Sequence, residues 1–112
     1  MNTDISYTLT YSIKKNNHQI DENQMEKNTS ISHGLNICEY VEELIHDYIY
    51  PKDENIKGID GDSIFPTQTK FDIVCDESKK YEYFDEMKTN IQNHNEFNLG
   101  DGVILKFENI NF

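Results

Sequence analysis

The chain contains no arginine and no alanine, and its ten basic residues are all lysine. Arginine is the residue that most often makes forked contacts to phosphate groups. A nucleic-acid-binding domain also usually carries a stripe of basic residues, and the 112 residues of this chain show none. The sequence therefore disfavours direct binding to DNA, RNA or an anionic membrane.

Cysteines and long apolar segments are also scarce. The two cysteines, Cys38 and Cys75, lie far apart and each falls on the apolar face of its expected element, so we expect buried free thiols in a reducing compartment. No apolar stretch approaches the ~20 residues that a membrane-spanning helix needs. The start of the chain, MNTDISYTLTYSI, lacks the basic and then apolar pattern of a signal peptide. We therefore expect a cytoplasmic protein.

Acidic residues are what the chain has in excess. It has 21 acids against ten lysines, a formal net charge of -11. The excess is uneven, because residues 1–38 carry a net charge of -1 and residues 39–112 carry -10. Such a balance favours a basic partner, or serves solubility.

The length fits one domain, spanning residues 1–112. Leucine, isoleucine, valine and phenylalanine make up 28 residues, or 25%. This fraction exceeds the ~20% below which charged chains tend to stay disordered. We therefore expect a folded protein, although the mean hydropathy of -0.77 indicates long polar loops.

Alternation of apolar and polar residues predicts strands. Residues 5–13, ISYTLTYSI, alternate over nine positions and predict a strand with one buried face. Further strands are expected at 67–76, after Pro66, and at 103–110. A return strand near 24–32 would form a hairpin with the first. Polar and glycine-marked segments predict a loop at 51–62 and a turn at 98–102.

Helical spacing appears twice. Residues 36–50 repeat apolar side chains every 3.6 residues, begin with a capping-box pattern at Asn36 and Glu39, and end before Pro51. A second helix is expected at residues 78–93, with Tyr83 and Met87 on its apolar stripe. These elements predict an α+β fold: a small mixed or antiparallel sheet of three to five strands with two α-helices packed on one face.

Carboxylates and tyrosines interleave on both expected helices. On the first helix, the acids lie opposite the apolar stripe, which suits either a solvated face or a face that docks a basic partner. Tyrosine supplies contact area for protein recognition. We expect Tyr40, Tyr50 and Tyr81 at the surface, and Tyr48 and Tyr83 in the core. The candidate partner-binding residues are Glu39, Tyr40, Glu42, Glu43, Asp47, Tyr50, Tyr81, Glu82, Asp85 and Glu86.

Motifs for catalysis or metal binding are weak. Glu43 and His46 form one Glu-x-x-His step, whereas a di-iron bundle needs two such steps and more helices. The calcium-loop pattern, counted over twelve residues from Asp53, fails at its fifth and twelfth positions, which are Lys57 and Ile64. Nucleophile and nucleotide-binding motifs do not occur in the sequence. We predict no catalytic residue, no metal site and no cofactor.

These observations lead to one main hypothesis and two alternatives. The main hypothesis is an acidic protein inhibitor that blocks a basic, nucleic-acid-acting protein. It would be an immunity protein or antitoxin for a nuclease toxin, or a phage anti-defence protein, such as an anti-CRISPR, that imitates the charge of DNA. One alternative is a small divalent-metal-binding domain or enzyme built around Glu43, His46 and the 53–62 loop. The other is an adaptor subunit that assembles with its partner without inhibiting it.

Overall fold

The computed structural model describes residues 1–27 and 34–112 of the chain. Its central element is the long strand β1 (Asn2–Lys15), which buries every second side chain from Ile5 to Ile13. The predicted alternation is therefore confirmed. One face of β1 is apolar and the other carries serine and threonine hydroxyls, so this strand sets the two faces of the sheet.

The sheet is antiparallel throughout. β1 lies between β4 (Gln68–Asp76) and β6 (Val103–Asn111), and the edges are β3 (Gly58–Gly61) and β5 (Glu96–Gly100), in the order β3-β4-β1-β6-β5. A sixth strand, β2 (His18–Gln19), pairs with the end of β1. The expected α+β fold is confirmed, with one short strand beyond the expected range.

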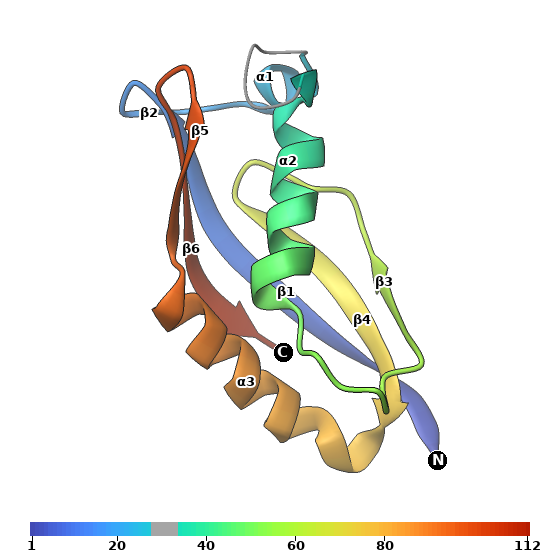
Figure 1. Ribbon diagram of the computed structural model, residues 1–112. Helices are drawn as coiled ribbons and strands as arrows, with labels where there is room; N and C mark the ends of the chain where they lie inside the picture. Colours follow the sequence, from blue (N-terminus) through green and yellow to red (C-terminus); the bar gives the residue numbers. More distant parts are fainter. Residues whose placement is uncertain (28–33) are drawn as a thin grey trace.

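The helices cover one face of this curled sheet, as Figure 1 shows. They are the short helix α1 (Glu22–Glu26), then α2 (Ile37–Leu44) continuing as a π-helical turn η2 (Ile45–Ile49), and finally a 3-10 turn η3 (Glu77–Lys79) leading into α3 (Lys80–Asn93). Both predicted main helices are confirmed. Asn36 caps α2 by accepting a hydrogen bond from the Glu39 amide at 2.8 Å, and the chain is extended at Tyr50 before Pro51.

Three local expectations were wrong. The return strand near 24–32 is absent at residues 24–26, which belong to α1, and residues 28–33 lie outside the described residues. Asp21 and Gln24 form a reciprocal capping box that favours the helix there. The expected loop at 51–62 contains β3, and the expected turn at 98–102 begins with part of β5. Both short strands are specified by pairing with β4 and β6, which local sequence does not reveal.

The core lies between the sheet and the helices. Two buried tyrosines of β1 keep their hydroxyls satisfied, since Tyr7 donates to the carbonyl of Lys80 and Tyr11 to that of Phe65, each at 2.7 Å. Burial raises the pKa of Tyr7 to about 12. The largest fully buried side chains are Tyr7, Tyr83, Phe71, Phe107, Leu9, Ile13, Met25, Ile37, Ile45, Ile49, Ile73 and Met87.

Candidate partner-binding surface

The exposed side of α2 and η2 carries a line of carboxylates. The buried side of these helices is apolar, with Val41 and Ile45 against the sheet, so the acids between them face outward. We call these four exposed residues the acidic ridge. The acidic ridge consists of Glu39, Glu42, Glu43 and Asp47.

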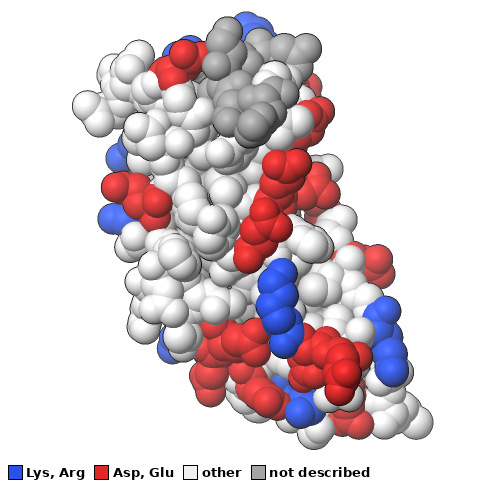
Figure 2. All heavy atoms as spheres, viewed as in Figure 1, with Lys and Arg blue, Asp and Glu red and all other residues white. Residues whose placement is uncertain are grey.

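Figure 2 shows carboxylate groups following the course of α2 and gathering again below it, with a lysine between them. Three residues of the ridge, Glu39, Glu42 and Glu43, line a shallow open hollow of about 410 Å³ together with Leu35 and His46. The sequence expectation that these residues share one side of the helix is confirmed.

The ridge lacks neutralising lysines. Residues 37–49 contain four acids and no lysine. Asp47 lies 3.6 Å from His46, measured between Oδ1 and Nδ1, and both side chains are exposed. Across residues 1–27 and 34–112, the only lysine within 4.0 Å of a carboxylate is Lys79, which pairs with Glu82. The four ridge carboxylates are therefore exposed without a direct lysine partner among the described residues.

This arrangement costs stability. Like charges four residues apart, such as Glu39 and Glu43, destabilise a helix by about 0.2–0.5 kcal/mol per pair. Asp47 lies in the last turn of the continuous helix, where the helix dipole favours cations and disfavours anions. Only Glu39, in the first turn of α2, is placed favourably with respect to the dipole.

The π-helical turn changes which residue is buried after Ile45. In a regular α-helix Tyr48 would lie directly below Val41 and Ile45, and we expected it in the core. The wider turn, closed by the Tyr50 amide on the Ile45 carbonyl at 3.0 Å, shifts the buried position by one residue. Ile49 is therefore fully buried and Tyr48 is 39% exposed, so the prediction for Tyr48 was wrong.

Tyr48 is part of an aromatic cluster that the sequence did not suggest. Its ring centroid lies 5.0 Å from that of His94, at the end of α3, and 5.0 Å from that of Phe97, on β5. We call Tyr48, His94 and Phe97 the aromatic cluster. Because Tyr48 follows Asp47 directly in the chain, the cluster adjoins the acidic ridge.

The other predicted tyrosines differ in exposure. Tyr40 and Tyr50 are half-buried, where we expected surface positions, and Tyr50 packs against Phe71 with 4.9 Å between ring centroids. Burial, with a smaller effect of nearby Glu42, raises the pKa of Tyr50 to about 12. Tyr81 is 66% exposed, as expected, and Tyr83 is buried, as expected. Tyr40 and Tyr50 thus serve packing more than recognition.

The predicted acids of α3 are partly engaged within the fold. Glu82 pairs with Lys79 at 3.0 Å, and Glu86 accepts the backbone amide of Lys52 at 2.9 Å. The ammonium group of Lys52 donates to the carbonyl of His46, so Lys52 separates the ridge from the α3 acids. Asp85 is exposed. The site residues therefore form two groups, of which the ridge is the less neutralised.

Metal and thiol chemistry gain no support from the geometry. No group of three or more His, Cys, Asp or Glu side chains is arranged to hold a metal ion within the part of the chain that the structure describes. The Asp53 carboxylate accepts from the Asn55 amide at 3.0 Å and from the Tyr83 hydroxyl at 2.8 Å, so its role is to anchor the loop. Burial and the nearby acids Glu26, Glu39 and Glu42 raise the pKa of Cys38, which disfavours a reactive thiolate.

Comparison with protein-family models, with curated proteins and with solved structures gave no match for this chain. The described helices include none long and apolar enough to cross a membrane. The features that bear on function are therefore the geometry and electrostatics of the ridge and the aromatic cluster.

Proposed function

We propose that the protein is a small cytoplasmic inhibitor whose acidic ridge covers the basic cleft of a nucleic-acid-acting protein, in the simplest case a nuclease. The observation that supports this most is the ridge itself, where four exposed carboxylates fall within nine residues of a helix that has no lysine. A surface needed only for solubility would gain from interspersed lysines, which lower the repulsion.

The negative charge of the ridge is complementary to the positive charge of a surface that binds nucleic acid. Asp47 lies eight positions after Glu39, which corresponds to about 12 Å along a helix. A cleft that binds phosphates is lined by lysine and arginine, and the ridge would occupy the same positive charges. Substrate and inhibitor then exclude one another. This mechanism serves an immunity protein or antitoxin against a nuclease toxin, and equally a phage anti-defence protein that imitates DNA.

The aromatic cluster would complete the contact. Charges at the rim of an interface mainly speed association, whereas buried aromatic side chains slow dissociation. Tyr48 is the exposed member nearest to the ridge. We assign the ridge to encounter with the basic cleft and Tyr48 to retention of the complex.

The test begins with copurification of the tagged protein from its native host, followed by mass spectrometry of bound proteins. The expected partner is basic and acts on nucleic acid, and its activity falls when the purified protein is added. Recovery of a stoichiometric partner whose activity is unchanged would replace the inhibitor proposal with the adaptor alternative. Absence of any basic partner would remove the proposal.

Two matched variants locate the interface. One reverses the ridge, with Glu39, Glu42, Glu43 and Asp47 each changed to lysine. The other reverses four exposed acids outside the ridge, namely Asp4, Asp60, Asp62 and Glu108. Both change the net charge by the same amount. We expect the ridge variant to slow association at least about tenfold and the control to slow it far less. Equal losses in both variants would show that net charge, not the ridge, guides binding.

A further inference from the structure

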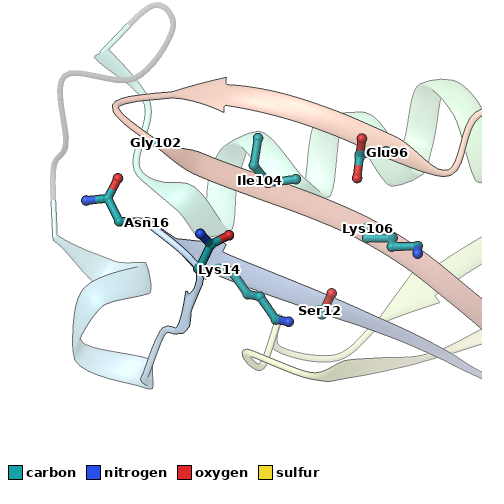
Figure 3. Close-up of a pocket in the computed structure, with 8 residues that line it drawn as sticks. Ser12, Lys14, Asn16, Glu96, Gly102, Ile104 and Lys106 are labelled. Atoms are coloured by element: carbon teal, nitrogen blue, oxygen red, sulfur yellow. The ribbon is translucent and has the colours of Figure 1, made fainter.

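A second hollow lies on the face of the sheet away from α2 and α3. It has a volume of about 310 Å³ and is formed by β1, β5, β6 and the turns at their ends (Figure 3). Cross-strand pairing explains its composition, because Lys106 lies directly opposite Ser12 on one side and Glu96 on the other. We call it the lysine hollow. Its lining includes Ser12, Lys14, Asn16, Glu96, Ile104 and Lys106.

The lysine hollow reverses the charge balance of the chain. It contains two lysines and one carboxylate, whereas the whole chain has 21 acids and ten lysines. Among the residues that the structure describes, neither Lys14 nor Lys106 has a carboxylate within 4.0 Å, although Glu96 is the cross-strand neighbour of Lys106. In Figure 3 Ser12 lies between the ends of the two lysines. Two ammonium groups and a hydroxyl thus line the same hollow as hydrogen-bond donors.

One end of the hollow is held by two turns in close contact. Asn16 and Asn17 both adopt positive φ, 50° and 69°, in the turn between β1 and β2. The Asn16 amide donates to the carbonyl of Gly102, at 3.0 Å, in the turn between β5 and β6. Gly102 packs against the Asn16 side chain and adopts a φ of 77°, in the left-handed region that favours glycine. These two turns therefore form the end of the hollow next to Lys14.

We propose that the lysine hollow binds a small phosphate-bearing anion, either inorganic phosphate or the phosphate group of a mononucleotide. Lysine and hydroxyl donors are well suited to phosphate oxygens. A long polyanion is disfavoured, because the net charge of -11 repels it along its length. A single phosphate meets mainly the local field, since exposed charges are screened over ~8 Å at physiological ionic strength. The hollow and the acidic ridge lie on opposite faces, so this inference is independent of the proposed inhibition.

The test is a titration of the ¹⁵N-labelled protein with inorganic phosphate at neutral pH and constant ionic strength, followed by amide chemical shifts. We expect saturation with a Kd on the order of 1 mM and the largest shifts around residues 12–16 and 102–106. The double variant K14Q/K106Q should weaken binding by about tenfold. E96Q should tighten it by about threefold, because it removes the one carboxylate from the lining.

The matched control is K70Q, which removes a lysine from the same face of the sheet but outside the hollow. It should leave phosphate binding within about twofold of the unchanged protein. Shifts that do not saturate, or an equal loss in K70Q and K14Q/K106Q, would overturn the proposal. A parallel titration with adenosine 5′-monophosphate identifies the source of the phosphate: tighter binding with added shifts at Ile104 indicates a nucleotide, and equal binding indicates the phosphate group alone.

Discussion

The open face of the sheet and the outer side of α2 and η2 expose different kinds of polar side chain to solvent. The open face of the sheet alternates hydroxyls with charges of both signs, since Thr8 lies opposite Lys70 and Ser6 donates to the Asp72 carboxylate at 2.5 Å. The outer side of α2 and η2 carries four carboxylates and no lysine. One face mixes its charges, and the other concentrates a single sign.

This difference bears on function because both faces belong to the same sheet-and-helix fold and are exposed to the same solvent. The sheet face shows that mixed charges and hydroxyls suffice for hydration. The acidic ridge is destabilised by like-charge repulsion and by the helix dipole, whereas the sheet face has neither effect. A surface that is costlier than its neighbour supports a role in recognition, and the inhibitor proposal gives it one.

The largest expected effect is the loss of stability when a side chain is removed from the core between the sheet and the helices. Leu105 and Ile104 are adjacent on β6, but Leu105 is fully buried toward the helices and Ile104 is half-buried on the open face. Leu105→Ala should lower the free energy of unfolding by about 2–5 kcal/mol. Ile104→Ala should lower it by about 1 kcal/mol, since the site is already partly hydrated. Urea denaturation measures both.

Equal losses in the free energy of unfolding from these two substitutions would contradict the difference in burial between the two faces. They would mean that something covers the open face in solution as closely as the helices cover the other. The concentration dependence of unfolding would then show whether a second copy of the chain provides that cover.

Much of this architecture follows from periodicity in the sequence. β1 and the two main helices were predictable because their apolar residues repeat at two or at 3.6 positions, and burial follows the repeat. The acids from Glu39 to Asp47 fall opposite the buried stripe, so the ridge was also predictable. Features that depend on helical geometry within one segment are visible in that segment.

Features that depend on distant pairing were not predictable. β3 and β5 contain glycines and are strands because β4 and β6 supply their hydrogen bonds. The lysine hollow requires the register that places Lys106 opposite Ser12. Tyr48 was misplaced for another reason, since one wider turn after Leu44 moves burial to Ile49 and no residue pattern announces that turn.

A smaller effect tests directly how much the like charges of the ridge lower the stability of the fold. Glu43→Lys converts the repulsion with Glu39, four residues earlier, into attraction. We expect the free energy of unfolding to rise by about 0.5–1 kcal/mol at low salt, and the gain to shrink as salt increases. The control is Asp4→Lys on the open face, with an expected change within about 0.5 kcal/mol. An equal gain from both would show that total charge, not the ridge, sets the cost.

The smallest effect separates acids that have internal partners from those of the ridge. Asp76 accepts the Ser78 amide at 2.9 Å, and this hydrogen bond is the main cause that lowers the pKa of the Asp76 carboxyl to about 2. A lowered carboxyl pKa adds stability above the ordinary value near 4, and this stability is lost as pH falls through about 2.

Asp76→Asn keeps an acceptor for the Ser78 amide but removes the charge. Between pH 4 and pH 2 the unchanged protein should therefore lose more stability than Asp76→Asn does, which urea midpoints across this range would show. Glu42→Gln, on the ridge, is the matched change, because it removes one carboxylate charge from an exposed position. If Glu42→Gln flattened the pH profile as much as Asp76→Asn, the ridge carboxylates would be held by the fold itself, and their availability for a basic partner would be in doubt.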